Sequence, residues 1–150
     1  MSSETDLIKL YSSRILALAA DIPHLERLED PDVTVKKRSP LCGSTVTVDL
    51  KVEDGKITDF GQDVKACALG QAAASVVADH IIGCSLETVE KARNQLKAML
   101  TEGAEPPQAP FDELEVLVPA REFKNRHASI MLALDATREA LQQVAKEECT

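Results

Sequence analysis

The chain has 150 residues and carries 25 acidic side chains against 17 basic ones, which gives a formal net charge of −8. This charge argues against a nucleic-acid-binding protein, because binding to phosphates requires clustered lysines and arginines. The length suits one domain over residues 1–150 that can bury a core without disulfides or a structural metal. No apolar run reaches the length of a membrane span and the first six residues lack the features of a signal peptide, so we expect a cytoplasmic protein without membrane association.

The first forty residues predict one helix and one strand. Apolar residues recur at helical spacing from Asp6 to Ala20, and Pro23 ends this helix. The stretch from His24 to Asp32 is mostly polar and turn-like. A short strand at Val33–Lys37 is then expected along the edge of the hairpin that follows.

A hairpin is the central predicted element. Apolar and polar residues alternate along its first strand, as in a strand with one buried face, and the apolar set is Val46, Val48, Leu50 and Val52. Asp54-Gly55 suits a tight turn, because glycine tolerates the positive φ of a type I′ turn. The second strand returns through Ile57, Phe60 and Val64. We therefore expect Cys42, before the first strand, and Cys67, after the second, to converge.

Two helices are predicted after the hairpin. The segment Cys67–Ile82 is rich in small residues that let a helix lie close against the sheet, and Gly83 ends it. The next helix runs from Ser85, which is suited to cap it, to about Leu100.

The remainder of the chain predicts a break and a final helix. A proline-rich linker spans Thr101–Pro110, and a short apolar segment, Phe111–Val118, ends at Pro119. The last helix runs from about Asn125 to Lys146. Together these elements predict an α+β fold, with a small antiparallel sheet of about three strands packed against several helices.

The four cysteines differ in their sequence surroundings. In a cytosolic protein they indicate thiol chemistry or metal binding rather than a disulfide framework. Cys42 lies in a Pro-Leu-Cys-Gly loop that presents its side chain outward, and Cys67 opens a helix, where free N–H groups lower the pKa of a thiol. Cys67 could instead pack as a small core residue among alanines. Cys84 is expected to be buried, and Cys149 to be a tail residue without a role.

A metal held by two thiolates needs further donors to complete a tetrahedral site. One possible donor is His127, whose imidazole would suit iron or zinc, although a solvated histidine is the alternative. His80 is excluded, because it follows Cys67 by 13 residues on the same helix, about 20 Å away at 1.5 Å per residue. The basic run Lys36-Lys37-Arg38 precedes Cys42 and is either a solvated face or a surface that faces a partner.

Three segments resemble the U-type iron-sulfur cluster assembly scaffolds, namely Pro40–Ser44, Lys65–Ser75 and Arg126–Ile130. The similarity covers nearly everything from Leu7 to Leu141, and the long insertion before the third segment is similar to that of the SUF-type branch. The resemblance implies an α+β fold, sulfur supplied by a cysteine desulfurase, and a site of three cysteines and one aspartate for a nascent iron-sulfur cluster or a zinc ion.

By this resemblance, Cys42 and Cys67 are the first and second cysteines of the site. Ser44 stands where the family has the aspartate of its Cys-Gly-Asp motif. With two thiolates retained, the implied metal ligands are Cys42, Cys67 and, as a replacement donor, His127.

The third cysteine position is ambiguous by one residue. Alignment with the ISC-type His-Cys-Ser-Ile motif places Ala128 there, whereas the SUF-type Arg-x-x-Cys spacing from Arg126 places Ser129 there. Neither residue carries a thiol, and a serine hydroxyl binds soft iron or zinc poorly compared with a thiolate.

The resemblance implies a protein that is not an enzyme. Such a protein binds iron or a cluster, or accepts sulfur from a cysteine desulfurase. Acceptor apo-proteins then receive the product. Two alternatives stay open: an accessory or regulatory protein that docks a desulfurase without binding metal, and a metal-free persulfide carrier. The expected cofactor is accordingly a transient iron-sulfur cluster, zinc, or none, and a homodimer could supply missing ligands. The sequence contains no nucleophile–base pair, phosphate loop or cofactor fingerprint.

Overall fold

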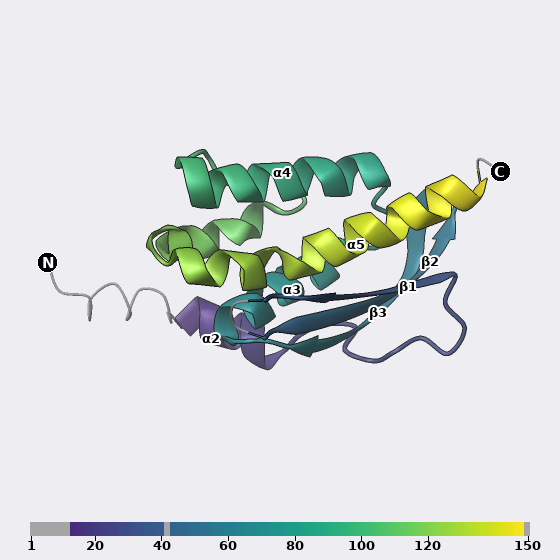
Figure 1. Cartoon of the computed structure of the whole chain (residues 1–150), viewed down its shortest axis with the longest axis horizontal. Helices are drawn as coiled ribbons and strands as arrows, with labels where there is room; N and C mark the ends of the chain where they lie inside the picture. The colour runs from purple at the N-terminus through teal and green to yellow at the C-terminus, as the bar shows by residue number, and fades with distance from the viewer. Residues whose placement is uncertain (1–12, 41–42, 149–150) are drawn as a thin grey trace, which may run out of the picture.

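The computed structural model describes residues 13–40 and 43–148 and contains one three-stranded antiparallel sheet with helices stacked above it (Figure 1). The strands lie in the order β1 (Val33–Arg38), β2 (Thr45–Glu53) and β3 (Lys56–Lys65). The helices are α2 (Ser13–Ala20), α3 (Ala68–His80), α4 (Leu86–Glu102) and α5 (His127–Glu148), with two 3-10 helices, η1 (Asp112–Glu122) and η2 (Lys124–Arg126). The predicted α+β class is confirmed.

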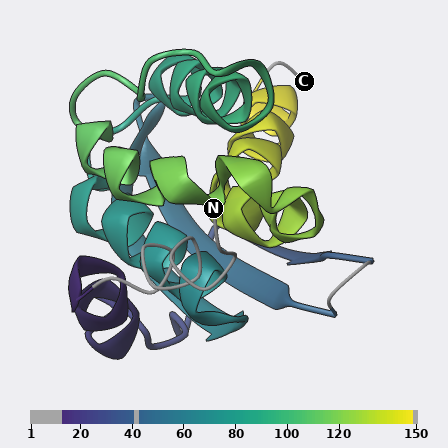
Figure 2. The same ribbon diagram turned by 90° about the vertical axis from the view of Figure 1, so that its left-hand side faces the viewer.

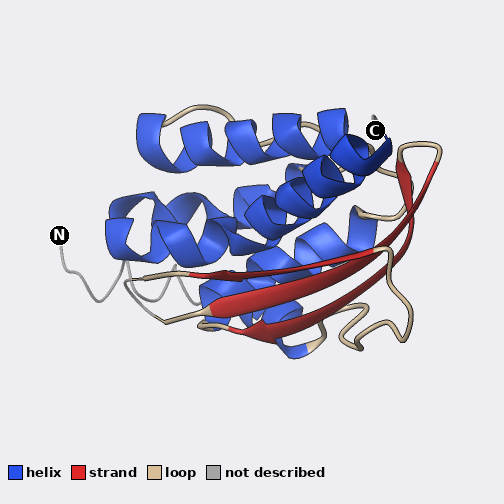
Figure 3. Ribbon diagram, turned by 45° about the vertical axis from the view of Figure 1, so that its right-hand side comes forward, coloured by secondary structure: helices blue, strands red, loops and turns tan. Residues whose placement is uncertain are grey.

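The layers follow from which helices contact the sheet. α5 packs on β1 and β2, α3 packs beside α5, and α4 lies outside them against α5 and η1 (Figures 1 and 3). Viewed from the end, η1 runs across the face formed by α3 and α5 (Figure 2). None of the helices in the described ranges is long and apolar enough to cross a bilayer.

The predicted hairpin and its edge strand are confirmed. β2 pairs with β1 and with β3, and Thr45 faces Arg38 on one side and Lys65 on the other. Asp54 and Gly55 both adopt positive φ, 53° and 76°, as the type I′ turn requires. The two ends of the hairpin therefore finish at the same edge of the sheet, beside the start of α3.

The core lies between the sheet and the α3/α5 layer. The inward residues of β2 predicted from the alternation are buried, except for Val52, which is partly exposed. The small residues of α3 are buried as well, which allows close packing against its neighbours; they include Gly70, Ala72, Ala73, Ala74 and Ala78. This close approach fixes the start of α3 against the start of α5.

The other face of the sheet is less exposed than the alternation predicts. Asp49, on the polar side of β2, is 0% exposed because the irregular segment 21–32 folds over it. Its carboxylate accepts hydrogen bonds from Arg27 Nε at 2.6 Å, Arg27 Nη2 at 3.1 Å, Leu28 N at 3.1 Å and Thr34 Oγ1 at 2.6 Å. The stretch from His24 to Asp32 is turn-like as predicted, and it also covers part of the sheet.

The helix boundaries agree with the sequence prediction in the middle of the chain. Within the described residues the first helix spans Ser13–Ala20, and the earlier part of the predicted helix lies outside them. Ser85 caps α4 by accepting a hydrogen bond from Thr88 N, as expected.

After Ser85, one predicted boundary is confirmed and one was wrong. The helix expected to run to about Leu100 ends at Glu102, and Gly103, whose φ of 70° suits a left-handed C-cap, follows it. The apolar segment expected to end at Pro119 is part of η1, which contains this proline and continues to Glu122. The longer segment brings Leu114, Leu117 and Ala120 into the core, and this burial offsets the backbone N–H that proline lacks.

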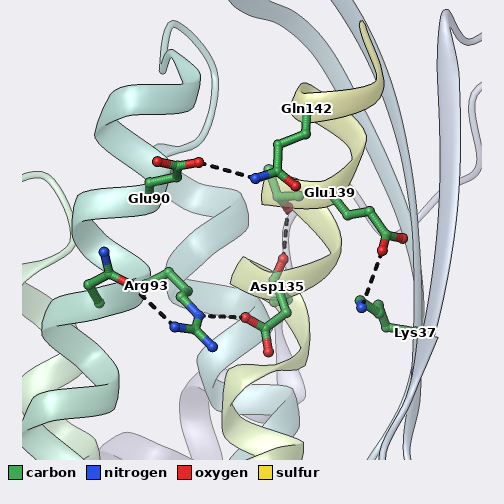
Figure 4. Close-up of polar contacts among 9 residues, drawn as sticks. Lys37, Glu90, Arg93, Asp135, Glu139 and Gln142 are labelled. Atoms are coloured by element: carbon green, nitrogen blue, oxygen red, sulfur yellow. Dashed lines mark hydrogen bonds and ion pairs between the residues drawn. The ribbon is translucent and has the colours of Figure 1, made fainter. Parts of the chain in front are cut away.

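Polar contacts join α4 to α5 (Figure 4). Arg93 Nε donates to Asp135 Oδ1 at 2.9 Å, and Gln142 Nε2 donates to Glu90 Oε1 at 3.2 Å. Both contacts lie where the two helices face each other, so they set the position of α4 along α5.

Candidate functional site

Cys67 lies at the junction between β3 and α3. It is the N-cap residue of α3, with extended backbone angles (φ −68°, ψ 170°), and its side chain is half-buried. Its backbone carbonyl accepts the N–H of Gln71, which begins the helix. The first N–H groups of α3 are therefore close to the thiol, as the sequence predicts.

Two serine hydroxyls extend from Cys67 into the protein. Ser129, in the first turn of α5, places its Oγ 3.7 Å from Cys67 Sγ and 3.1 Å from Ser44 Oγ. Ser44 lies just before β2 and is held by a backbone bond from Ser39 N to its carbonyl at 2.8 Å. Both serines are buried, at 5% exposure for Ser44 and 1% for Ser129. Three elements that are distant in the sequence thus bring one thiol and two hydroxyls together.

This Cys67–Ser129–Ser44 chain can serve both protonation states of the thiol. A protonated Cys67 can donate to Ser129, which donates to Ser44. When Cys67 loses its proton, Ser129 can rotate its hydroxyl hydrogen toward the sulfur and accept from Ser44 in return. Ser129 can therefore hydrogen bond to the thiolate directly, while Ser44 hydrogen bonds to Ser129.

The pKa of Cys67 lies below its ordinary value. Burial by itself would raise the pKa, but hydrogen bonds from the Gly70 N–H and the Ser129 hydroxyl stabilise the thiolate and outweigh it. The Leu69 N–H and the Arg126 side chain add to the same effect. The low pKa makes Cys67 a better nucleophile and a better metal ligand than an ordinary cysteine.

Gly70 makes the close approach of α3 and α5 possible at this point. A Cβ placed on Gly70 would lie 2.5 Å from Ser129 Oγ and 2.8 Å from Ala66 Cβ. Both distances are too short for a Cβ atom, so a larger residue at position 70 has to displace Ser129 or the start of α3.

We expect Gly70→Ala to lower the free energy of unfolding by about 1–3 kcal/mol, as overpacking commonly does. It should also raise the pKa of Cys67, because the displaced Ser129 no longer donates to the thiolate. Urea unfolding and the pH dependence of Cys67 alkylation measure the two effects, with Ala68→Gly, at a half-buried position of the same turn, as the comparison. An unchanged alkylation profile in Gly70→Ala would contradict the proposed role of the Ser129 hydroxyl.

The other predicted site residues have different positions. Cys42 lies outside the described residues, so its convergence with Cys67 stays a prediction. His127 is the first residue of α5, is half-buried, and has its Nε2 3.0 Å from the carbonyl oxygen of Ala120. Ala128 is half-buried and forms no part of the Cys67–Ser129–Ser44 chain.

The basic run on β1 is divided between two environments. Lys36 and Arg38 are exposed, whereas Lys37 forms an ion pair with Glu139 of α5 at 3.3 Å (Figure 4). Lys37 thus connects the sheet to α5.

Cys84 and His80 do not join the site. Cys84 is 7% exposed and donates to the carbonyl of His80, and burial raises the pKa of its thiol, as expected for a structural cysteine. Cys149 lies outside the described residues. His80 is at the far end of α3, where ligand atoms of Asp79, His80 and Glu113 lie within 4.8 Å of one another on a largely exposed surface. Ion pairs account for this group, including one from Arg14 to Glu113 at 3.9 Å.

Comparison with known proteins places these features in a family. Residues 10–148 match the model of the NifU-like N-terminal domain. The chain is 26% identical over 137 residues to the iron-sulfur cluster assembly scaffold protein IscU of Thermotoga maritima, which covers 91% of this chain and 96% of that protein. It is also 26% identical over 126 residues to the protein of the same name from Streptococcus pyogenes, covering 84% of this chain and 79% of that protein.

Solved structures agree with these sequence matches. A nitrogen-fixing NifU-like protein (N-terminal) from Brucella abortus is 40% identical, with a TM-score of 0.91 over 94% of this chain and 98% of that one. A putative scaffold protein for the SUF system from Fervidobacterium islandicum shares the fold, with a TM-score of 0.81 at 19% identity over 89% of this chain and 98% of that one. On the match over residues 10–148 and the 40% identity, the chain belongs to the NifU-like N-terminal domain family.

Proposed function

We propose that the protein acts in iron-sulfur cluster assembly as a scaffold-like protein in which Cys67 accepts sulfur or binds iron. The observation that carries this proposal is the half-buried Cys67 thiol, whose pKa is lowered by the start of α3 and by Ser129. Family membership and the scaffold names of its relatives support the same role. Iron and sulfide are then cargo: a cysteine desulfurase in the cytoplasm supplies the sulfur, and the product passes to acceptor apo-proteins.

Within this proposal, Ser44 and Ser129 occupy the positions of the missing aspartate and third cysteine. Support comes from geometry, since Ser129 Oγ lies 3.7 Å from Cys67 Sγ and Ser44 Oγ lies 3.1 Å from Ser129 Oγ. This arrangement favours the alignment with the SUF-type Arg-x-x-Cys spacing, which places Ser129 at the third position, over the alignment that uses Ala128.

A bound metal would need donors beyond this chain of hydroxyls. Cys42 and Cys67 are the proposed thiolates, and a tetrahedral iron or zinc ion requires more than these two. His127 could add a nitrogen only if its Nε2 left the carbonyl of Ala120 or its other ring nitrogen were used. An external thiol or a second copy of the chain is the other source of ligands.

Anaerobic reconstitution with iron, sulfide and a desulfurase tests the proposal. We expect a visible absorption band in the wild-type protein and its loss in Cys67→Ser, since the thiolate of Cys67 is the ligand that the fold most clearly prepares. Cys84→Ala, a change to the other described cysteine, serves as the matched control and should keep the band. A full band in Cys67→Ser would overturn the assignment of Cys67.

The two hydroxyls also favour a second candidate, a metal-free persulfide carrier. In this reaction the Cys67 thiolate attacks the outer sulfur of the donor's persulfide, the donor's S–S bond breaks, and the donor leaves as a thiolate. Mass spectrometry after incubation with desulfurase and cysteine should then show one added sulfur on the peptide containing Cys67, without bound metal. A desulfurase complex that shows neither metal nor added sulfur would instead indicate a non-catalytic accessory protein.

A further inference from the structure

A cleft lies where α2, α3 and η1 run side by side (Figure 2). It encloses about 350 Å³, and its lining residues come from all three elements and from the segment after α2. The polar side chains that line it are mostly acidic, and they are Arg14, Asp21, Ser75, Asp79 and Glu113. Asp79 follows Cys67 by 12 residues, about 18 Å along α3 at 1.5 Å per residue, so these acidic residues are separate from the cysteine site.

His80 completes a group of three possible metal ligands beside this cleft. Its Nε2 lies 3.5 Å from Asp79 Oδ2 and 4.0 Å from Glu113 Oε1, and one ligand atom from each of the three residues lies within 4.8 Å of the others. The imidazole ring packs edge-on against Phe111, with ring centroids 6.5 Å apart. In a metal site with bonds of about 2.1 Å, neighbouring ligand atoms lie about 3.0–3.5 Å apart. Rotation of the two carboxylate side chains would therefore bring the group around one ion.

The ion pairs of this group explain why its side chains cluster, but they leave an excess of negative charge. Those of His80 exist only when its imidazole is protonated, and Arg14 is 3.9 Å from both Glu113 and Glu115. Asp79 lies in the last turn of α3, where the helix dipole disfavours an acidic side chain and favours a cation. A cation between Asp79 and Glu113 would therefore be stabilised by both carboxylates and by the end of the helix.

Ser75 gives an independent indication of a ligand in the cleft. It is 3% exposed and lines the cleft one helical turn before Asp79, so the two side chains share a face of α3. No residue in the described part of the chain forms a hydrogen bond with its hydroxyl. A buried hydroxyl without a partner costs free energy. A water molecule bound to a metal ion at Asp79 would supply the missing hydrogen bond.

We infer that Asp79, His80 and Glu113 bind a divalent transition-metal ion, with Ser75 hydrogen bonded to a water ligand of that ion. One imidazole nitrogen and two carboxylates suit Mn²⁺, Fe²⁺ or Zn²⁺ better than Mg²⁺ or Ca²⁺, which prefer oxygen ligands alone. Arg14 competes with the ion for Glu113, and its side chain, 57% exposed, turns toward solvent when the ion binds. The ion joins the end of α3 to η1, and this site is independent of the proposed function.

Titration of the full-length protein with Mn²⁺, followed by the EPR signal of the free ion, tests the site, because Mn²⁺ binds thiolates weakly. We expect saturable binding of one ion by the wild-type protein and by Cys67→Ala alike. Glu113→Gln and Asp79→Asn keep the size of side chains that are not buried, and each should weaken binding at least about tenfold. Ser75→Ala should also weaken binding about tenfold, as loss of an outer-shell hydrogen bond commonly does. Arg14→Gln should tighten binding, because it removes the competing cation.

The matched control is Asp112→Asn, which removes the same charge from an exposed position of η1 outside the group and should leave Mn²⁺ affinity nearly unchanged. An equal loss in Asp112→Asn and Glu113→Gln would show attraction by net charge alone and would overturn the inference. Excess Mg²⁺ should displace less Mn²⁺ from the wild-type protein than from His80→Gln, because only the wild-type site offers a nitrogen ligand. Equal displacement from both proteins would overturn the site as assigned. Absence of Mn²⁺ binding by the wild type would also overturn it and would leave the proposed function, which rests on Cys67, intact.

Discussion

The double variant Ser44→Asp/Ser129→Cys is expected to bind zinc at least about a hundredfold more tightly than the wild-type protein. The two changes introduce the donor types that the resemblance implies for the family site, an aspartate carboxylate and a further thiolate beside the proposed thiolates of Cys42 and Cys67. Competition with a chromophoric chelator measures the affinity. With cobalt in place of zinc, the intensity of the sulfur-to-metal charge-transfer absorption reports how many thiolates bind.

The spacing of Cys67 and Ser129 is close to the spacing of two ligands in a tetrahedral zinc site. With Zn–S bonds of about 2.3 Å, two sulfurs of a tetrahedral site lie about 3.8 Å apart. Ser129 Oγ is 3.7 Å from Cys67 Sγ, so a sulfur at position 129 would need little movement to share a metal with Cys67. Ser44 Oγ is 3.1 Å from Ser129 Oγ, close enough for a carboxylate at position 44 to reach the same ion.

The matched control is Ser44→Asp/Ala128→Cys, which places the third thiol at the other candidate position. Successive residues of an α-helix point about 100° apart, so a cysteine at 128 would project away from Cys67 while that at 129 projects toward it. No comparable gain in zinc affinity is expected for this control. Tighter zinc binding by the 128 variant than by the 129 variant would contradict the assignment of Ser129 to the third ligand position.

The single variant Ser44→Asp shows what the new carboxylate does to folding stability apart from its effect on zinc binding. Position 44 is 5% exposed, so without metal the new carboxylate is desolvated, and the free energy of unfolding should fall by roughly 2–4 kcal/mol. Saturating zinc should return much of this loss in the double variant, because the ion binds only the folded state. Thermal unfolding with and without zinc measures both effects.

Local sequence patterns predicted the elements that carry Cys67 because each of those elements has a local cause. Strict alternation defines β2, the pair Asp54-Gly55 supplies the positive φ of the turn, and Ser85 caps α4. These causes act over a few residues, so a single sequence displays them. The position of Cys67 at the start of α3 followed directly from them.

The remaining features depend on tertiary contacts that no local pattern displays. Pro119 normally interrupts a helix, yet burial of Leu117 and Ala120 keeps it inside η1. The choice between Ala128 and Ser129 depends on the rotation of α5, which packing against α3 decides through Gly70. Asp49 looks like a solvent-facing strand residue until segment 21–32 folds over it.

Asp49→Asn is expected to lower the free energy of unfolding by about 1–3 kcal/mol near neutral pH, the range for leaving buried polar groups without their hydrogen-bond partners, because Arg27 is half exposed and water can solvate its charge. The carboxylate is 0% exposed and accepts four hydrogen bonds, two of them from the guanidinium of Arg27. An amide keeps the size of the side chain, but it loses the charge and puts an NH₂ group where donors already point. Asp59→Asn, an exposed site on β3, is the matched control and should change stability by less than about 0.5 kcal/mol.

The pH dependence of unfolding gives the same interaction an independent test. Burial alone would raise the pKa of Asp49, but hydrogen bonds from Arg27, Thr34 and the Leu28 N–H, with the charge of Arg27, hold the pKa below its ordinary value. A carboxyl whose pKa is lower in the folded state adds stability at pH values above its unfolded pKa, near 3.9, and loses that stability as the pH falls through the folded pKa. Below about pH 4 the free energy of unfolding should therefore fall more steeply for the wild-type protein than for Asp49→Asn. The free energies of the two proteins then converge in acid. If the free energies of unfolding of the two proteins fall in parallel from pH 7 to pH 3, the charge of the Asp49 carboxylate does not hold segment 21–32 on the sheet.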